Sequence, residues 1–326
     1  MARKARRIPL IYVLSIFTCS AAWGFGSEGH ETTAAIAAQF LTGSNAEKEI
    51  KKILRPGEDL AWAARWADCA KGYRYCGKPL TGEMKAFVAK NRNHHRYHFA
   101  DIPFEISKYD SNAVGASQED VVHILVQAIA VLQGKSDLTN NPHRFTTREA
   151  FFLVCHLTGD IHQPLHVGAA YIDPHNQFVK PASQYDVDSG KAAKTKGGNW
   201  LMLGSQNLHD NWDTLYIQRA MKRHGAISPQ EFAIALTVKG MPVPRDAGDP
   251  ITWPERWATE SVMLAKTEME GISIDALTKV DSGGSTHPQW AITPPLNYSA
   301  KVVTMSEQQL WLAGARLAQI FKAIWP

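Results

Sequence analysis

Residues 150–166 read AFFLVCHLTGDIHQPLH. The first five of these residues are all apolar, which is the composition of a buried helix. On a helical period, His156 and Asp160 are four residues apart and therefore lie on one face. An imidazole and a carboxylate one turn apart form half of a metal site, and Pro164 ends the helix just before His166. The stretch predicts a buried helix that carries metal ligands.

A second His-xxx-Asp pair follows at His209 and Asp213. A single such pair is weak evidence, because each residue is more often a core histidine or a helix-surface acid. Two pairs beside apolar runs, where lone charges are costly, favour a metal. Nitrogen and oxygen donors suit zinc, and more than four of them indicate more than one ion. Further candidate ligands occur at His30, Asp68 and His98.

Almost every segment after residue 24 has a helical pattern. The expected helices cover residues 31–41, 45–54, 59–71, 117–133, 146–163, 205–223, 229–238, 253–270 and 307–324. A further long helix is expected from near residue 82. Residues 167–199 form a Pro/Gly-rich loop, whose length is typical of a functional loop. A second loop covers 240–250, and residues 271–304 look irregular. Strand-like alternation is almost absent and no linker divides the chain, so we predict an all-α fold with one multi-helix domain over 25–326.

The first 24 residues have the pattern of a cleaved secretory signal peptide. A basic start precedes a short apolar run over residues 8–17, and small residues follow it. The apolar run is too short to span a bilayer, and no later segment is long and apolar enough. We therefore expect a secreted or periplasmic protein without a membrane span.

The positive formal charge comes from this leader. The whole chain has 35 Lys and Arg against 31 acidic residues, a net charge of +4. The four excess basic residues are Arg3, Lys4, Arg6 and Arg7. The rest of the chain is therefore neutral, and any attraction for an anionic substrate must come from a local site.

The cysteines fall into three settings. Cys19 lies in the leader. Cys69 and Cys76 are close in sequence, and an exported compartment permits a disulfide between them. Cys155 is expected to be a buried free thiol rather than a ligand, because His156 and Asp160 face elsewhere on the helix.

Short motifs match a known family in order along the chain. They are GH at 29–30, WAD at 66–68, HFAD at 98–101, HLTGDIHQPLH at 156–166, GGN at 197–199 and NLHDNWD at 207–213. Together they resemble the zinc-dependent single-strand nucleases of fungi, plants and bacteria, the mung-bean-nuclease type, whose all-helical fold is shared with zinc-dependent phospholipase C. The last third of the chain contains no motif of this family.

The resemblance implies three zinc ions. The first ion would be held by Asp68, His98, His156 and Asp160. The second ion would be held by His166, His209 and Asp213. The third ion would be held by His30, by Asp160 as a bridging carboxylate, and by backbone atoms of the first mature residue.

The first mature residue departs from the family pattern. The family begins at a Trp five residues before its first ligand histidine, whereas Trp23 lies seven residues before His30 and Phe25 has the expected spacing. Chelation by the α-amino nitrogen and the carbonyl oxygen uses backbone atoms, so Phe can replace Trp. We therefore expect cleavage after Gly24 and ligation by Phe25. Cleavage after Ala22, which leaves Trp23 first, is the alternative.

The resemblance also implies catalytic roles. A water that bridges the first and third ions, whose ligands include the catalytic candidates Asp68 and Asp160, would attack the phosphate, and the second ion would stabilise the leaving 3′ oxygen. Lys71, one helical turn after Asp68, would contact the transition state; a solvated surface lysine is the alternative. The products would carry 5′-phosphates.

Three residues are candidates for substrate binding. Phe99 would stack on a base and Asp101 would accept from the base edge, which requires an unpaired base and favours single strands. Core packing is the alternative role for Phe99. Asn199 would orient a ligand or the substrate.

Other histidines and tryptophans are expected to be structural. His162 lies in the main motif but is expected to support it. The tryptophans Trp200, Trp212, Trp253 and Trp257 are expected in the core. The histidines without a partner at metal spacing are His94, His95, His123, His143, His175, His224 and His287.

These observations predict a secreted zinc-dependent endonuclease that cleaves single-stranded DNA and RNA, with 3′-nucleotidase activity as a further option. A phospholipase C-like hydrolase is the first alternative, but that branch has Glu in its last ligand pair, and Asp213, Lys71 and Asp101 favour the nuclease. A non-catalytic zinc-binding protein is the second, but a metal cluster with open positions is unsuited to storage. We expect a monomer, with single-stranded nucleic acid or nucleotides as substrate and without a stable protein partner.

Overall fold

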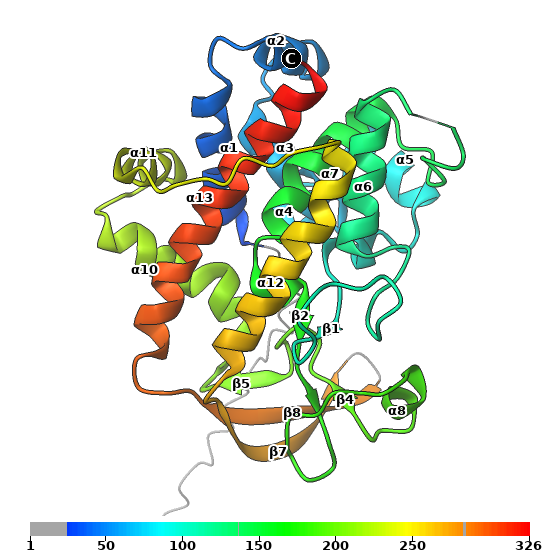
Figure 1. Ribbon diagram of the computed structural model, residues 1–326, viewed down its shortest axis with the longest axis vertical. Coiled ribbons are helices and arrows are strands. Elements are labelled where there is room, and N and C mark those ends of the chain that lie inside the picture. The colour runs from blue at the N-terminus through cyan, green and yellow to red at the C-terminus, as the bar shows by residue number, and fades with distance from the viewer. Residues whose placement is uncertain (1–24, 136, 283–284) are drawn as a thin grey trace, which may run out of the picture.

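The computed structural model describes residues 25–326 except 136 and 283–284, so the predicted leader lies outside the described residues. Helices dominate (Figure 1). The α-helices are α1 (Ser27–Leu41), α2 (Asn45–Ile53), α3 (Leu60–Ala70), α4 (Tyr73–Cys76), α5 (Gly82–Lys90), α6 (Val121–Leu132), α7 (Thr147–Asp160), α8 (Gln184–Asp188), α9 (Leu208–Asp210), α10 (Tyr216–Arg223), α11 (Pro229–Lys239), α12 (Trp253–Met269) and α13 (Tyr298–Ile324). The short 3-10 and π elements are η1 (His94–His98), η2 (Pro164–His166), η3 (Asn211–Leu215) and η4 (Pro250–Thr252).

The strands form small sheets. Strand β1 (Ile102–Pro103) pairs in parallel with β2 (Gly168–Ala169), and β3 (Tyr171–Ile172) pairs antiparallel with β4 (Ala193–Lys194). A four-stranded sheet has the order β6-β5-β8-β7. Its strands are β5 (Leu201–Leu203), β6 (Gln206–Asn207), β7 (Ser273–Ser282) and β8 (Ser285–Thr293). The sheets are minor beside the helices, so the predicted all-α class is confirmed.

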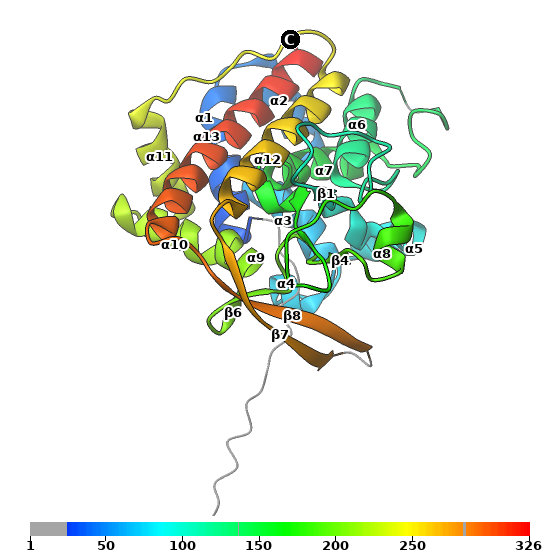
Figure 2. The same cartoon turned by 60° about the horizontal axis from the view of Figure 1, so that its bottom comes forward.

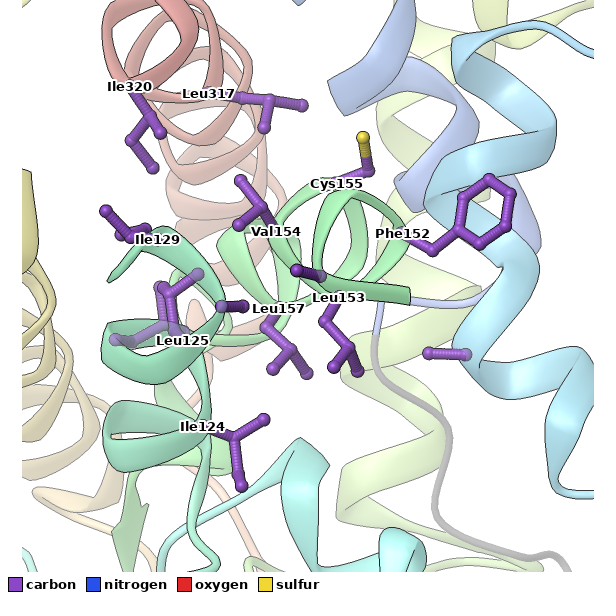
Figure 3. Close-up of a cluster of buried hydrophobic side chains, with 14 of the residues drawn as sticks. Ile124, Leu125, Ile129, Phe152, Leu153, Val154, Cys155, Leu157, Leu317 and Ile320 are labelled. Atoms are coloured by element: carbon purple, nitrogen blue, oxygen red, sulfur yellow. The ribbon is translucent and has the colours of Figure 1, made fainter. Parts of the chain in front are cut away.

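Helix α7 lies at the centre of the core. Thr146 and Glu149 form a capping box at its start, which satisfies the first backbone N–H groups. Every residue from Glu149 to Asp160 is buried, which explains why its apolar residues show no single stripe. Figure 3 shows Leu125 and Ile129 of α6 and Leu317 and Ile320 of α13 around α7. Burying each such side chain contributes roughly 1.5–3 kcal/mol. Because buried residues occupy every face of α7, packing stabilises the helix on all sides.

The three cysteines among the described residues behave as predicted. Cys69 and Cys76 form a disulfide that joins the end of α3 to α4. Cys155 is a buried free thiol among the described residues, and burial raises its pKa well above the ordinary value.

The prediction of an irregular segment over 271–304 was wrong. Residues 273–293 contain the β7–β8 hairpin, which lies across the end of the molecule opposite the C-terminus (Figures 1 and 2). Most of its side chains are exposed, and buried and exposed residues alternate only at the end of β8, around Trp290 and Ile292, so the hydrophobic pattern is too short to reveal the hairpin. Helix α13 also begins earlier than predicted, because the β-branched Val302 and Val303 weaken the helical signal but are buried against neighbours.

Three other predicted segments differ from the structure in their length or in the number of elements they contain. The helix near residue 82 is short, ending at Lys90. Residues 167–199 contain β2, β3, α8 and β4 rather than one loop. Residues 205–223 are divided into β6, α9, the π-helical turn η3 and α10. A π turn inside a helix is frequent at functional sites, and here it carries the candidate ligand Asp213.

None of the described helices is long and apolar enough to cross a membrane.

Candidate metal centre

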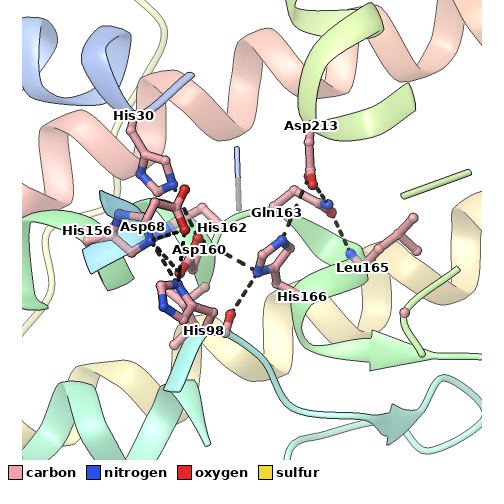
Figure 4. Close-up of polar contacts among 12 residues, drawn as sticks. His30, Asp68, His98, His156, Asp160, His162, Gln163, Leu165, His166 and Asp213 are labelled. Atoms are coloured by element: carbon pink, nitrogen blue, oxygen red, sulfur yellow. Dashed lines mark hydrogen bonds and ion pairs between the residues drawn. The ribbon is translucent and has the colours of Figure 1, made fainter. Parts of the chain in front are cut away.

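Three groups of buried His and Asp side chains converge at one place in the fold. In each group the potential ligand atoms all lie within 4.8 Å of one another. Figure 4 shows His30, Asp68, His98, His156 and Asp160 close together, with His166 and Asp213 beside them. The groups are His30, His156 and Asp160; Asp68, His98 and His156; and His166, His209 and Asp213. Every side chain predicted as a ligand belongs to one of them.

The ligands come from separate elements that pack around α7. His30 comes from α1 and Asp68 from α3, and both helices contact α7. His98 ends η1, and His166 ends the η2 turn that begins at Pro164. Gly159 permits the approach of α1, because a Cβ there would lie 2.8 Å from His30 Nδ1.

Four of these side chains, those of Asp68, His98, His156 and Asp160, have the donor geometry of a cation site. His98 Nδ1 lies 2.9 Å from His156 Nε2, and these atoms lie 3.0 Å and 3.1 Å from Asp160 Oδ2. Asp68 Oδ1 lies 3.7 Å from His98 Nδ1 and 3.6 Å from His156 Nε2. Two imidazole nitrogens and two carboxylates that point at a common centre are the ligand types of zinc.

Asp160 connects this group to the next. Its Oδ2 faces His98 and His156, while its Oδ1 lies 3.3 Å from His30 Nε2. Neither His30 Nε2 nor Asp160 Oδ1 has a hydrogen-bond partner among the described residues, although both side chains are fully buried. One carboxylate that turns its two oxygens to two sets of imidazoles suits the predicted bridging role.

The remaining group comes from η2, α9 and η3. His209 Nε2 is 3.2 Å from Asp213 Oδ2, and His166 Nε2 is 3.7 Å from Asp213 Oδ1. Gln163 donates from Nε2 to Asp213 Oδ1 at 2.7 Å and accepts from the Leu165 N–H at 2.6 Å. Gln163 thus fixes the Asp213 carboxylate, a role that the sequence motif did not reveal.

Backbone carbonyl groups orient three of the imidazoles. His156 Nδ1 donates to Ala64 O at 2.5 Å. His166 Nδ1 donates to His98 O and His209 Nδ1 donates to Gly197 O, both at 2.7 Å. A carbonyl only accepts, so each Nδ1 carries the proton and each Nε2 keeps its lone pair for a metal. Gly197 is required there, because it has φ +57° and a Cβ would lie 2.3 Å from Leu165 O.

Burial controls the protonation of the histidines. Burial, helped by His156, lowers the pKa of His30 to about 4. Burial, helped by Lys71, lowers the pKa of His98 to about 3. Both imidazoles are therefore neutral near pH 7, which is the form that binds metal.

The carboxyl groups differ in their pKa values. Burial alone would raise the pKa of Asp68, but Lys71 and His156 hold it below its ordinary value. Burial raises the pKa of Asp213 well above the ordinary value in the absence of a cation. Asp213 Oδ2 and His209 Nε2 are buried without a hydrogen bond among the described residues, at a penalty of about 1–3 kcal/mol each. A bound cation would compensate these groups, so the donor set fits a metal.

Phe25 lies at the start of α1 and is completely buried. The next residue, Gly26, donates its N–H to Asp213 O at 2.8 Å, which ties this end of the chain to η3. Gly29 allows Phe25 to fold back on α1, because a Cβ there would lie 2.6 Å from Phe25 Cβ. Ligation by the Phe25 backbone stays a prediction.

A cleft of about 560 Å³ opens beside the metal groups and includes His98, His166 and His209 in its walls. Lys71, Phe99, Asp101 and Asn199 all line it, so the predicted substrate residues lie together. The Lys71 side chain is 4 % exposed and its Nζ lies 2.7 Å from Asp68 Oδ1, which excludes a solvated surface lysine. Phe99 is only half-buried and faces the cleft rather than filling the core.

Asp101 and Asn199 are held differently. Burial raises the pKa of Asp101, against the effect of Lys194 and Lys196. Asn199 donates its side-chain N–H to Lys196 O at 2.8 Å, so it stabilises the loop that precedes β5 as well as facing the cleft.

Several cleft residues were not predicted. Trp200 was expected in the core, but it is half-buried and lines the cleft, whereas Trp212, Trp253 and Trp257 are buried as expected. His287 also lines the cleft after being set aside for lack of a metal partner. The other lining residues without a predicted role are Tyr75, His95, Arg96, Leu165, Lys194, Lys196 and Gly197. His162 is structural as expected: its Nδ1 donates to Thr158 O at 2.7 Å, and its Nε2 lies 3.0 Å from Arg316.

An all-helical fold with three adjoining His/Asp groups at one cleft defines a protein built to hold several metal ions. The S1/P1 Nuclease family matches residues 25–326, and the chain belongs to this family. It is 26% identical over 217 residues to Endonuclease 2 of Arabidopsis thaliana, covering 65% of this chain, and 30% identical over 224 residues to Nuclease S1 of Aspergillus oryzae, covering 66%. The chain spans 62% of the length of each of these relatives. The resemblance stated from the motifs is confirmed.

Proposed function

We propose that this chain is a zinc-dependent nuclease that hydrolyses phosphodiester bonds in single-stranded DNA and RNA and leaves 5′-phosphate products. The observation that carries the proposal is the position of the His/Asp groups in the wall of a cleft that also contains Lys71, Phe99 and Asp101. Family membership and the printed names of the two relatives support it.

The metal ligands are proposed in three sets. One zinc ion would be held by Asp68, His98, His156 and Asp160. A second would be held by His166, His209 and Asp213. A third would be held by His30, by the free oxygen of Asp160 and by the backbone of Phe25. Bound zinc would supply a water of lowered pKa and positive charge to balance the phosphate.

The chain's own residues bind and position the substrate. Lys71 holds its ammonium group 2.7 Å from Asp68 Oδ1, at the point where the cleft meets the metal groups. There the ammonium group can donate to a phosphate oxygen as negative charge develops on it. Gln163 keeps the Asp213 carboxylate in place through its 2.7 Å hydrogen bond.

Preference for single strands follows from the cleft wall. Phe99 offers a half-buried ring to a base, and Asp101 lies two residues further along the same wall. A base that stacks on Phe99 and donates to Asp101 uses the edge that is occupied in a duplex. Unpaired bases therefore bind and paired bases do not.

We further propose that the functional protein is a secreted or periplasmic monomer with one domain, which begins at Phe25 after removal of residues 1–24. The fully buried position of Phe25 beside η3 supports this start point. N-terminal sequencing of the exported protein tests it, and a mature chain that begins at Trp23 contradicts it.

The function is tested by measuring acid-soluble nucleotide released from single-stranded DNA, RNA and duplex DNA. We expect release from both single strands, loss of activity with a chelator, and recovery on addition of zinc. His209→Ala should be inactive under all conditions. Phosphatidylcholine serves as the control substrate. Hydrolysis of the lipid without hydrolysis of nucleic acid, or zinc binding without either activity, would refute the proposal.

A further inference from the structure

The cleft has a second wall, formed by residues that have no place in the proposed metal or Phe99 sites. Trp200 and His287 both line the cavity, and their rings are stacked with centroids 5.0 Å apart and planes 18° apart. Trp200 directly precedes β5, while His287 belongs to β8. The pair therefore joins two segments that are distant in sequence.

Backbone pairing fixes this stack. Strands β5 and β8 are parallel neighbours with Leu201 opposite Trp290. The Trp290 N–H donates to Trp200 O at 2.9 Å, which ties the residue before β5 to the hairpin. The sheet thus holds together the two backbone segments that carry the stacked rings.

The loop before the stack also reaches the metal groups. Trp200 N donates to Thr195 O at 3.1 Å, which closes the loop. Within it, Gly197 O accepts the hydrogen bond from the candidate ligand His209 at 2.7 Å. Lys196 and the two glycines that follow have positive φ angles, so the loop has a tight, defined shape. The backbone at Trp200 is therefore tied to the group that contains His166, His209 and Asp213.

Positive charge surrounds the stack. Lys196 Nζ lies 4.5 Å from the centroid of the Trp200 ring, and the Lys196 side chain is exposed. Lys194 and Arg96 line the same cavity, and among the described residues Asp101 is the one carboxylate in its lining. An aromatic surface beside cationic side chains is the combination by which proteins bind single-stranded nucleic acid.

The partial exposure of this pair separates it from the core. Trp212 and Trp257 are completely buried, whereas Trp200 and His287 are only half-buried at the cavity wall. An aromatic pair needed only for packing would exclude water on all sides. The side chain of Lys196 is long and exposed. Its ammonium group can therefore move from the Trp200 ring to a phosphate when a base covers that ring.

We propose that Trp200 and His287, together with Lys194 and Lys196, form a second nucleotide subsite. It takes the base on the other side of the scissile phosphate from the base that stacks on Phe99, and the two lysines bind the adjoining phosphate. This inference rests on the proposed nuclease function. With this subsite the enzyme binds the bases of two consecutive nucleotides rather than of one.

Dinucleoside monophosphates with one base removed test the subsite. Three substrates are compared: the intact dinucleotide and two analogues that carry an abasic sugar at one position or the other. In the unaltered enzyme each abasic analogue should have kcat/KM lowered by about 10-fold, which is the loss expected for one base–aromatic stack. Trp200→Ala and His287→Ala should remove the sensitivity at one position only, and Phe99→Ala should remove it at the other.

Matched controls separate binding from folding. Leu277→Ala changes a 45% exposed side chain that pairs with Trp290, on the opposite face of the hairpin from His287, and should leave all three rates unchanged. Zinc content of each variant is measured in parallel and should equal that of the unaltered enzyme. If Trp200→Ala lowers the rates on all three substrates equally, or keeps both sensitivities, the subsite is refuted.

A binding measurement distinguishes this outcome from failure of the proposed function. A phosphorothioate-linked dinucleotide is titrated into the zinc-loaded protein and into Trp200→Ala. Binding that weakens about 10-fold in the variant supports the subsite even if no nucleic acid is hydrolysed. Hydrolysis with binding unchanged in the variant refutes the subsite and leaves the nuclease function intact.

Discussion

Helix α7 and the β7–β8 hairpin both contribute to the site, but different forces hold them. Every residue of α7 from Glu149 to Asp160 is buried, so packing surrounds the helix. The hairpin is held by its backbone ladder and by a few buried side chains, mainly Trp290 and Ile292. Two of the candidate metal ligands, His156 and Asp160, thus lie on a helix that is enclosed by packing, whereas His287 of the second cleft wall lies on a hairpin with few buried side chains. Binding of metal and binding of substrate should therefore be separable by mutation.

The largest effect is expected at Asp160, which faces two ligand groups. Asp160→Asn removes the negative charge between His98, His156 and His30. We expect loss of zinc from both groups and a fall in kcat of at least about 100-fold, more than loss of an outer hydrogen bond produces. Zinc content and the initial rate on single-stranded DNA check this. Asp188→Asn on the exposed helix α8 is the control, and full zinc content in Asp160→Asn would contradict the bridging role.

Removal of metal should affect the two regions unequally. A chelator leaves the buried atoms of His30, His209 and Asp213 uncompensated, so the protein should lose about 4 kcal/mol if free zinc had been 1,000-fold above its dissociation constant. Hydrogen exchange should rise in α7 and η3 and stay constant in β7 and β8. Chemical denaturation and exchange measured with and without zinc check both statements. Equal changes in the hairpin would show that the two regions unfold together.

Two glycines allow a finer test within the helical region. In Gly159→Ala the new methyl group meets His30 Nδ1 at 2.8 Å, whereas in Gly314→Ala it meets Ile36 Cβ at 2.5 Å. The first change should lower zinc content and reduce activity about 10-fold while retaining most of the stability. The second should lower stability by about 1–3 kcal/mol through overpacking and leave zinc content unchanged. Metal analysis and thermal unfolding distinguish the two, and the same outcome in both variants would argue against a specific role for Gly159.

The smallest effect on catalysis is expected from the hairpin anchor. Trp290 is 2% exposed and donates from its side chain to Asn176 Oδ1 at 3.1 Å. Trp290→Ala should loosen the hairpin, raise KM for oligonucleotides about threefold to tenfold, and leave kcat and zinc content unchanged. Steady-state kinetics with metal analysis check this. A loss of zinc would show that the hairpin supports the metal centre.

These regions also differ in how far the sequence predicts them. The spacing of His156 and Asp160 is a local helical pattern, so the ligand helix can be recognised from a few residues. The approach of Trp200 to His287 depends on the β5–β8 pairing, which no local pattern in either segment indicates. The hairpin was missed for a related reason: most of its residues are exposed, and only a few side chains, mainly Trp290 and Ile292, are buried.

The hydrogen bonds that orient the candidate ligands were also only partly predictable from the sequence. The carbonyl groups of Ala64 and Gly197 orient His156 and His209, but a backbone atom has no residue type by which to recognise it. The doubled glycine at 197–198 was the available signal, since a tight turn near a ligand needs positive φ angles. Gln163 belongs to the main motif, but its hydrogen bond to Asp213 could not be predicted, because Asp213 lies on an element distant in sequence.

The disulfide between Cys69 and Cys76 encloses Lys71 in a small covalent ring next to the ligand Asp68. Such a ring closes only where thiols are oxidised. In a reducing cytosol the same chain would carry Lys71, the proposed contact to the transition state, on a segment that no covalent ring closes. If the chain is exported as proposed, the ring around Lys71 would close only after export, which would shield the producing cell's own nucleic acids from the nuclease.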